Sequence, residues 1–257
     1  MRSFGTSLVA CCALVCFLGG SAEAQIVNVL SKVGSEEGLS GGIEVSGEWE
    51  TGNVNLLEVT GEGSLHYRSG PHLVMFTVAA TYGIEDDEVY DKNIFEHLRY
   101  RPQVVGDLEW EVYAQHEFDK FRRLSARVLA GTGPRVQLMD WDGGKLMFGS
   151  AYMAEYILRP EDGLPDAREE EFNHRWSSYF SLSTSITPVL SLSQTFYAQP
   201  RFDAFDDVRY LSDTGLSAQV SESFSLVISL GLAYDTAPPL AVEKFESALE
   251  AGLAWGF

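Results

Sequence analysis

The chain has 257 residues, a formal net charge of −19, and hydrophobic and aromatic contents of 45% and 12%. This apolar content excludes an intrinsically disordered chain, and the mean hydropathy of −0.05 argues against a helical membrane bundle, which needs several apolar runs of about 20 residues. The acidic balance excludes a basic nucleic-acid binder, since affinity for phosphates needs clustered Lys and Arg.

The first 24 residues are predicted to be a secretory signal peptide. Arg2 precedes an apolar stretch at 8–18 and the small-residue pattern Ala22-Glu23-Ala24, which places cleavage after Ala24. The apolar stretch is too short for a transmembrane anchor. All three cysteines lie inside this segment: Cys11, Cys12 and Cys16. The exported chain is therefore expected to have no disulfide and no cysteine metal site.

From about Gly42 onward, hydrophobicity alternates with a period of two, which is the period of a β-strand. The last strand is the clearest, with Leu249 and Leu253 on one face and Glu250 on the other. Residues 25–40 lack this pattern and are predicted to be an N-terminal tail. Twelve strands are predicted, at 42–51, 54–69, 72–84, 91–102, 107–118, 122–136, 144–159, 171–186, 189–201, 206–220, 223–235 and 243–257. The fourth and sixth alternate poorly.

The predicted connections alternate between short and long. Segments with tight-turn composition are followed by longer acidic ones. The short connections are 69–71, 187–188 and 221–222, and the long ones are 85–88, 160–170, 203–207 and 235–242. This alternation is typical of transmembrane barrels, which have short periplasmic turns and longer outer loops. An even number of strands would place both termini at the periplasmic end.

The sequence therefore predicts an all-β fold for 41–257, a single antiparallel up-and-down transmembrane β-barrel of about twelve strands with a polar lumen. Lipid forbids unpaired backbone groups, and twelve strands enclose more space than side chains fill, so the apolar face should meet lipid. Aromatic residues near strand ends suit the interfacial girdles of such barrels. They are Trp49, Tyr67, Tyr82, Tyr100, Trp110, Phe118, Tyr234, Trp255 and Phe257. The alternative is a two-sheet periplasmic sandwich.

The C-terminal residues alternate and end on an aromatic side chain. They are Leu249, Ala251, Leu253, Trp255 and Phe257. This ending resembles the assembly signal of bacterial outer-membrane proteins. The resemblance implies the barrel assembly machinery as a partner during biogenesis, a location in the outer membrane of a diderm bacterium, and contact with outer-membrane lipid and lipopolysaccharide.

Several short motifs lie along the rest of the chain. They are Gly42-Ile43-Glu44-Val45-Ser46-Gly47, Thr51-Gly52-Asn53, Tyr67-Arg68-Ser69-Gly70, Asn93, Leu98-Arg99-Tyr100 and Phe118-Asp119. With these motifs, residues 41–257 resemble the family called domain of unknown function 481, or salt-induced outer membrane protein. The resemblance implies an outer-membrane barrel and carries no established activity or catalytic residues. The acidic segment 162–171 is longer than expected for this family.

Five histidines require that catalysis be considered: His66, His72, His97, His116 and His174. Ser64 and His66 share a strand face with Glu62, but same-face neighbours lie roughly 7 Å apart, too far for direct proton transfer. No phosphate loop, HExxH motif or nucleophile elbow is present, and the acidic segments match no EF-hand loop. No catalytic residue, cofactor or metal site is predicted, and the chain is expected not to be an enzyme.

Strand parity predicts an acidic wall in the lumen, formed by Glu44, Glu48, Glu50, Glu58, Glu62, Glu246 and Glu250. The basic groups gather elsewhere, at Arg99, Arg101, Arg123, Arg127, Arg135, Arg175 and Arg201. Two interpretations stay open. Cross-strand ion pairs could brace a closed barrel, or the acidic wall could favour cations in a narrow pore.

The leading functional hypothesis is a small passive pore or a structural envelope protein. The alternatives are a lipid-modifying barrel enzyme and a surface-binding protein that uses its acidic outer loops. The sequence does not indicate a permeant solute or an oligomeric state.

Overall fold

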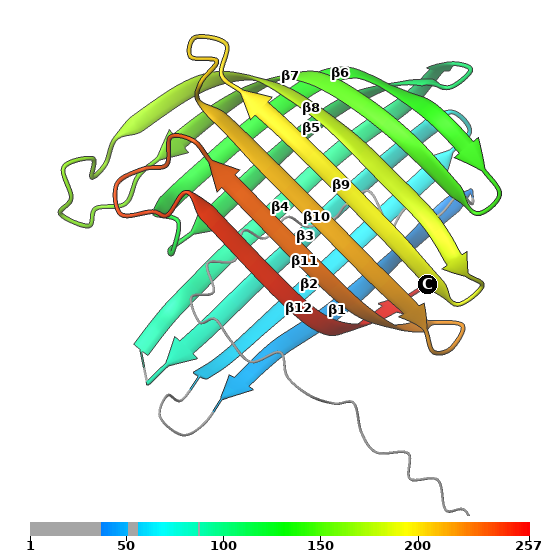
Figure 1. Cartoon of the computed structure of the whole chain (residues 1–257), viewed down its shortest axis with the longest axis horizontal. Helices are drawn as coiled ribbons and strands as arrows, with labels where there is room; N and C mark the ends of the chain where they lie inside the picture. The colour runs from blue at the N-terminus through cyan, green and yellow to red at the C-terminus, as the bar shows by residue number, and fades with distance from the viewer. Residues whose placement is uncertain (1–36, 51–55, 87) are drawn as a thin grey trace, which may run out of the picture.

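The computed structural model describes residues 37–50, 56–86 and 88–257, which form one closed antiparallel β-barrel (Figure 1). The strands within these ranges are β1 (Gly38–Glu50), β2 (Leu56–Ser69), β3 (His72–Glu85), β4 (Glu88–Val105), β5 (Leu108–Asp119), β6 (Leu124–Trp141), β7 (Gly144–Leu158), β8 (Glu170–Thr187), β9 (Leu190–Pro200), β10 (Val208–Gln219), β11 (Phe224–Asp235) and β12 (Phe245–Gly256). The predicted signal peptide lies outside the described residues. In the ranges given above, no helix is long and apolar enough to cross a membrane.

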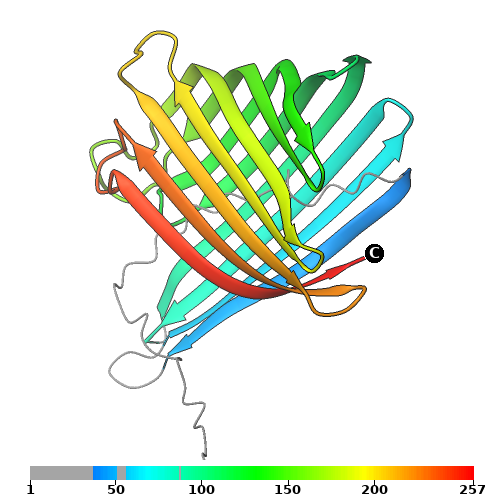
Figure 2. The ribbon, with the colours of Figure 1, turned by 45° about the vertical axis from the view of Figure 1, so that its right-hand side comes forward.

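The barrel closes by pairing β12 with β1 (Figure 2). Val45 lies opposite Leu253, and the backbones of Gly41 and Phe257 exchange hydrogen bonds of 3.1 and 3.0 Å. Each strand also pairs with its neighbours in the sequence. The predicted twelve-stranded up-and-down barrel is confirmed, and the sandwich alternative is wrong. Closure leaves no strand edge to meet lipid, as a membrane-spanning sheet requires.

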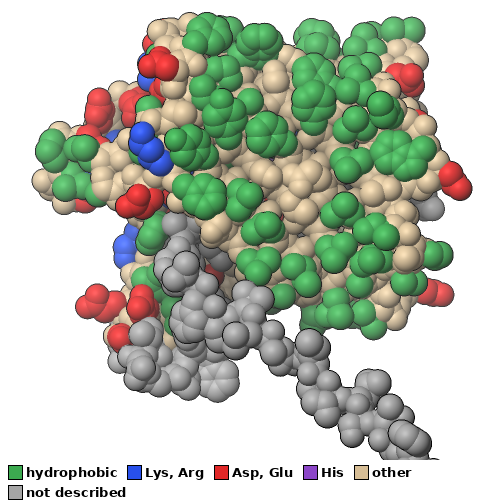
Figure 3. Space-filling model, viewed as in Figure 1, with side chains coloured by type: hydrophobic (Ala, Val, Ile, Leu, Met, Phe, Trp, Pro, Cys, Tyr) green, Lys and Arg blue, Asp and Glu red, His purple; other side chains and the backbone are tan. Residues whose placement is uncertain are grey.

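The outer face of the barrel is apolar and the inner face is polar. On β11, Leu226 and Ile228 are about half exposed, whereas Ser225 and Ser229 line the interior. Hydrophobic side chains cover most of the barrel surface seen in Figure 3, and the acidic side chains gather toward its ends. Soluble barrels have the opposite arrangement, with the apolar face inside. Because strand residues alternate with a period of two, one set can meet lipid while the other meets the lumen.

Most of the predicted interfacial aromatic residues lie on the outer face. Exposed rings belong to Tyr67, Tyr82, Tyr100, Trp110, Tyr234, Trp255 and Phe257. Two of them bind neighbours through their polar atoms: Trp110 Nε1 donates to Thr132 Oγ1 at 2.8 Å, and Tyr100 Oη lies 2.7 Å from His72 Nδ1. Phe118 is only partly exposed, and the side chain of Trp49 lies outside the described part of the chain.

Several strand boundaries differ from the sequence-based expectation. β1 begins at Gly38 rather than at 42, because residues 38–41 pair with the far end of β2. The connection after β3 is a tight turn rather than a long loop, since Glu85 and Glu88 pair with each other and leave 86–87 between them. β6 continues to Trp141, which pairs with Gly144.

Register shifts occur in β4 and β6 just beyond the predicted fourth and sixth strands. The pairing of β4 with β5 shifts between Gln103 and Val105. The pairing of β6 with β7 shifts between Gln137 and Met139. Within the predicted ranges, burial alternates regularly over 92–101 and 127–135. The sequence pattern blurs there because Phe95 and Leu129 point inward while Glu96 points outward.

Candidate functional site

The lumen is the candidate functional site, and its two ends differ. The terminal end holds the start of β1, the end of β12 and the connections 70–71, 106–107, 142–143, 188–189 and 220–223. The loop end holds the longest connections, 159–169, 201–207 and 236–244. Polar and charged side chains from the inner faces of the strands fill the loop end and leave space at the terminal end.

Glu155 on β7 is fully buried and accepts hydrogen bonds from three arginines. Arg127 Nε on β6 lies 2.6 Å away, Arg175 Nε on β8 lies 3.1 Å away, and Arg209 Nη1 on β10 lies 2.5 Å away. Three guanidinium groups around one carboxylate carry a net positive charge. A buried excess charge of this kind needs further acids nearby.

Those acids lie on both sides of the Glu155 group. Asp207 Oδ1 accepts a hydrogen bond from Arg175 Nη1 at 3.1 Å, and Asp235 Oδ2 accepts one from Arg209 Nε at 3.0 Å. On the other side, Glu117 Oε2 accepts from Arg127 Nη1 at 2.9 Å. We call this group and its continuation through Arg122 the loop-end lattice: Glu117, Arg122, Arg127, Glu155, Arg175, Asp207, Arg209, Asp235 and Glu246.

Arg122 connects the loop-end lattice to the opposite wall of the lumen. It lies in the turn between β5 and β6, where Nη1 donates to Glu117 Oε1 at 3.0 Å. Its Nε lies 3.4 Å from Glu246 Oε2 on β12. Because β12 belongs to the opposite side of the barrel, the two walls of the loop end are joined by charged side chains.

A second buried cluster surrounds Glu111 on β5. Glu111 Oε2 accepts hydrogen bonds from Arg99 Nη1 at 2.9 Å and Arg101 Nη2 at 3.3 Å. Its other oxygen accepts one from Tyr179 Oη at 2.5 Å. Tyr179 reaches β5 from β8 by lying over Gly149, where any Cβ would fall 2.2 Å from the tyrosine ring. Glycine at 149 is therefore part of the cluster.

Arg123 ties together three connections at the loop end. Its guanidinium binds Asp162 through Nε at 2.6 Å, Asp166 through Nη2 at 2.7 Å, and the carbonyl oxygen of Leu240 through Nη1 at 2.6 Å. These hydrogen bonds hold the pKa values of both aspartates below their usual range and raise the pKa of Arg123. We call Arg123, Asp162, Asp166 and Leu240 the loop clamp.

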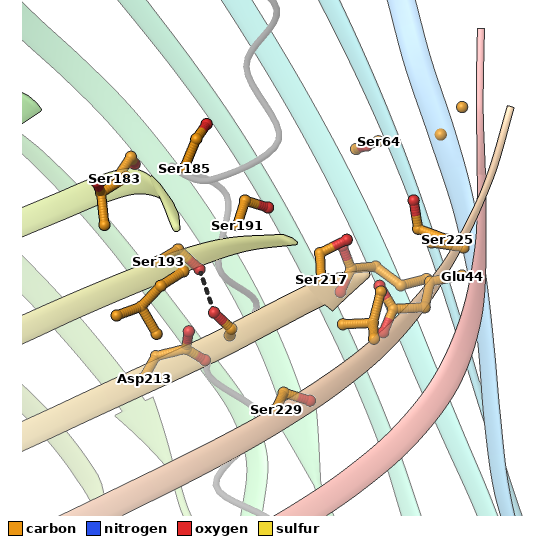
Figure 4. A pocket seen from close by; sticks show the side chains of 18 of the residues that line it. Glu44, Ser64, Ser183, Ser185, Ser191, Ser193, Asp213, Ser217, Ser225 and Ser229 are labelled. Carbon is orange, nitrogen blue, oxygen red and sulfur yellow. Dashed lines mark hydrogen bonds between the residues drawn. The ribbon is translucent and has the colours of Figure 1, made fainter. Parts of the chain in front are cut away.

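The terminal half of the lumen contains a cavity of about 830 Å³. Serines on β8 to β11 form much of its wall, and Figure 4 shows their side chains around the open space. Among them are Ser183, Ser191, Ser193, Ser217, Ser225 and Ser229. Because these side chains are short, this part of the barrel is not filled as the loop end is.

Part of the predicted acidic wall lines this cavity. Glu44 and Glu62 lie opposite each other on β1 and β2, and Glu250 Oε2 on β12 accepts a hydrogen bond from Ser46 Oγ at 3.0 Å. Six acids and one lysine line the cavity, so its wall is strongly negative. They are Glu44, Glu62, Asp140, Asp213, Glu222, Glu250 and Lys145.

Other members of the predicted wall lie elsewhere. Glu246 lies four residues closer to the loop end than Glu250 does, and its Oε2 is 3.4 Å from Arg122 Nε. Glu58 is buried on β2 and accepts a hydrogen bond from Tyr90 Oη on β4. The side chains of Glu48 and Glu50 lie outside the described part of the chain.

The predicted basic groups are ion-paired rather than gathered on one wall. Arg127 and Arg175 belong to the loop-end lattice, Arg99 and Arg101 to the Glu111 cluster, and Arg123 to the loop clamp. Arg135 pairs with Glu109, and Arg201 binds Asp203 Oδ2 at 2.8 Å and Asp207 Oδ2 at 3.1 Å. Hydrogen bonds from Arg201 lower the pKa of Asp203.

The sequence reasoning missed four important members of these clusters: Arg122, Glu155, Tyr179 and Arg209. Strand parity alone would have placed Glu155, Tyr179 and Arg209 on the inner face. It could not have predicted the contacts of Glu155 with Arg209 or of Tyr179 with Glu111, because these join strands that are not adjacent.

The five histidines divide between the two faces. His66 and His97 point inward, and His97 Nε2 accepts a hydrogen bond from Arg99 Nε at 3.2 Å. His72, His116 and His174 lie on the outer face. Ser64 and His66 share the inner face of β2, as expected. Across the described ranges, no group of three or more His, Cys, Asp or Glu residues is arranged to hold a metal ion.

Solved structures with a similar fold are bacterial outer-membrane barrels. A NanC porin matches with a TM-score of 0.51 at 10% identity, covering 84% of this chain and 98% of the porin. A KdgM porin in complex with disordered oligogalacturonate matches with a TM-score of 0.46 at 7% identity, covering 84% and 99%. The translocator domain of autotransporter NalP from Neisseria meningitidis has a TM-score of 0.44 at 12% identity, covering 86% and 88%. At these identities the likeness concerns the fold alone.

The search of curated proteins finds no match. Residues 43–257 match the family described as protein of unknown function, DUF481. The match begins within β1 and runs to the C-terminal residue of the closing strand. The chain therefore belongs to the DUF481 family and folds as an outer-membrane β-barrel.

Proposed function

We propose that the chain is a narrow passive pore of the outer membrane with a weak preference for cations. The observation that carries this proposal is the cavity of about 830 Å³, which is polar, negative and enclosed by the inner faces of the strands. A lumen lined by hydroxyls and carboxylates offers hydrogen bonds to water and hydrated ions along its length. The apolar outer face provides the seal against lipid.

The charge of the lumen supports a cation preference. At the loop end, arginines and acids alternate within hydrogen-bonding distance, so their fields largely cancel. At the terminal end, the cavity is lined by six acidic residues and a single lysine. The uncancelled field is therefore negative and concentrated in the cavity, where it raises the local concentration of cations.

The loop-end lattice supports a low conductance. The cavity beside Arg122, Arg209 and Glu246 measures about 40 Å³. This space is far smaller than the cavity of about 830 Å³ at the terminal end. Permeation would be limited at this level, while the acidic cavity would determine which ions reach it.

Planar-bilayer recordings test the proposal. The purified, folded barrel is expected to give small conductance steps and a reversal potential of cation-selective sign in a salt gradient. The double variant Glu62→Gln/Glu250→Gln should shift that reversal potential toward zero, and the serine-wall variant Ser191→Ala is the matched control. Inserted, folded protein that shows no conductance, or an anion preference, would refute the proposal.

A structural envelope protein is the second candidate, and the lattice across the loop end favours it. Charged side chains join opposite walls there, which would brace a closed barrel. The two candidates differ in one measurement: a closed barrel gives no steps in the native chain and acquires them when Arg122→Ala breaks the crossing contact.

Targeting and partners are part of the same proposal. We infer that residues 1–24 direct export and that the barrel assembly machinery recognises the ending from Leu249 to Phe257. Outer-membrane lipid and lipopolysaccharide would then surround the apolar outer face. The alternation of Leu249, Ala251, Leu253 and Trp255 on that face supports this inference. The proposal contains no catalytic step.

A further inference from the structure

The outer face of the barrel carries a glutamate–histidine pair in an apolar setting. Glu96 on β4 and His116 on β5 lie directly opposite each other. His116 Nδ1 is 3.1 Å from Glu96 Oε2, and the two side chains remain 42% and 49% exposed. Neither belongs to the lumen or to the ion-paired clusters described above.

The neighbours of this pair on the outer face are hydrophobic. Val78 lies opposite Glu96 on β3, and Val128 lies opposite His116 on β6. Both valines are exposed, as are Ile94 and Leu98. The pair is therefore surrounded by side chains that face lipid.

Its depth follows from the aromatic residues on either side. Tyr100 lies four residues from Glu96 toward the terminal end, and Tyr82 lies opposite Lys92, four residues toward the loop end. A tilted strand rises about 2.5 Å per residue along the membrane normal, so Glu96 lies about 10 Å from each aromatic level. This places the pair near the middle of the apolar band, which is about 25 Å tall.

Lipid tails cannot satisfy the remaining polar atoms of the pair. Ionisable groups at this depth are costly and are found paired with other polar groups. In the described part of the chain, no hydrogen bond other than the mutual one is made by either side chain. His116 Nε2 and Glu96 Oε1 therefore need partners from another molecule in the membrane.

We propose that the outer face around Glu96 and His116 is the docking surface for a second copy of this chain. Both copies would have the same orientation in the membrane, so the two-fold axis would run along the membrane normal. That symmetry brings His116 of each copy in front of Glu96 of the other. The pair is self-complementary in charge, and docking would join four side chains into one hydrogen-bonded group.

The surface beside the pair also allows close approach. Ala114 and Ala130 lie opposite each other on β5 and β6, and both are exposed on the outer face next to His116. Small side chains at membrane interfaces let two backbones come near each other and improve packing. Larger side chains at these two positions would hold a second barrel away from the histidine.

Site-specific oxidative cross-linking of the full chain in native outer membranes tests the proposal. All three cysteines lie at positions 11, 12 and 16, within the predicted signal peptide, so an introduced cysteine is expected to be unique. Ala114→Cys should give a product of twice the monomer mass. Ala251→Cys, which is exposed on the outer face of β12, is the matched control and should stay at background.

Two further variants in the Ala114→Cys background separate docking from random collision. Glu96→Leu/His116→Leu should fold, as judged by heat-modifiable gel migration, and lose cross-linking to background. The exchanged pair Glu96→His/His116→Glu keeps the complementarity and should retain cross-linking. The proposal is overturned by equal cross-linking at Ala114→Cys and Ala251→Cys, by persistence in the double leucine variant, or by a product whose mass shows a different partner protein. Each of these outcomes is independent of conductance.

Discussion

Arg122 Nε and Glu246 Oε2 lie 3.4 Å apart, and this contact joins the β5–β6 turn to β12 across the loop end of the barrel. The arginine side chain is 18% exposed and the glutamate side chain 5% exposed. The adjoining space measures about 40 Å³. In the proposed pore, this contact would lie across the path from the cavity to the loop end.

Removing Arg122 is expected to widen this constriction. In planar bilayers, Arg122→Ala should raise the single-channel conductance several-fold, because the long side chain fills space between β5 and β12. Arg168→Ala is the control, since Arg168 is exposed and pairs with Glu161 outside the lumen. Identical step sizes in wild type and Arg122→Ala would show that the narrowest point lies elsewhere.

Glu155 should be the most important carboxylate for stability. Glu155→Ala leaves three buried arginines without their shared acceptor and is expected to cost about 3–5 kcal/mol of unfolding free energy. Glu161→Ala removes an exposed partner of Arg168 and should cost about 0–1 kcal/mol. Urea titrations of folding into lipid vesicles measure both. Similar costs for the two variants would mean that the loop-end lattice adds little stability.

The assignment of the lipid-facing and lumen-facing sides of β11 can be tested by placing an arginine at each of two adjacent positions. Ile228→Arg puts a guanidinium into lipid near the midplane and should destabilise the folded barrel by about 2–4 kcal/mol. Ser229→Arg points into the cavity, where water and acids surround it, and should cost much less. Equal costs in a folding titration would contradict the assignment of the two faces.

The loop clamp should depend on pH in a defined direction. Arg123 lowers the pKa values of Asp162 and Asp166, so the clamp is fully stabilising above the unfolded aspartate pKa of about 3.9. It is lost as the pH falls through the lower pKa values of the folded state. Protection of residues 160–169 from hydrogen exchange, relative to the intrinsic rate at each pH, should be high at pH 5 and lost at pH 2.

The variant Arg123→Ala supplies the control for this pH dependence. It should show low protection of the same segment at both pH values, because the cation that holds the loop is gone. Protection that is unchanged by Arg123→Ala would indicate that the loop is held by other contacts, such as the backbone hydrogen bond from Arg168 to Pro160.

Deleting Phe257 should lower the amount of folded barrel in the outer membrane. Its backbone exchanges two hydrogen bonds with Gly41 where β12 meets β1, and its ring lies 5.2 Å from that of Trp255. Loss of the terminal residue removes both the proposed assembly signal and part of the closing seam. Immunoblots with heat-modifiable migration measure the folded fraction. Phe245→Ala, at the other end of β12, is the control, and normal levels in the deletion would contradict the prediction.

The alternation of residues along each strand could be interpreted without tertiary information. Leu226 and Ile228 face outward, and Ser225 and Ser229 face inward, as the period of two predicted. The same reasoning indicated a closed barrel, because apolar faces on twelve strands need lipid and unpaired edges cannot meet it. These features depend on each strand and its immediate neighbours, which is information that a single sequence contains.

Turn lengths were less predictable, because they depend on where pairing stops. Glu85 and Glu88 look like part of an acidic loop, yet they pair across β3 and β4. Charge repulsion between them is tolerated at the solvated end of the strands, where water screens it. The extension of β1 to Gly38 likewise depended on the length of its partner β2.

Charge and strand parity predicted an acidic wall and separate basic groups. The ion-pair partners of these residues depend on the tilt of the strands and the closure of the barrel. Glu246 contacts Arg122, and Glu155 accepts hydrogen bonds from arginines on β6, β8 and β10. Strand parity determines only whether a side chain points inward or outward. Which inward side chains meet depends on the stagger between strands and on reach across the lumen. Long arginine side chains span that distance, so contacts between strands far apart in sequence exist only once the sheet has closed.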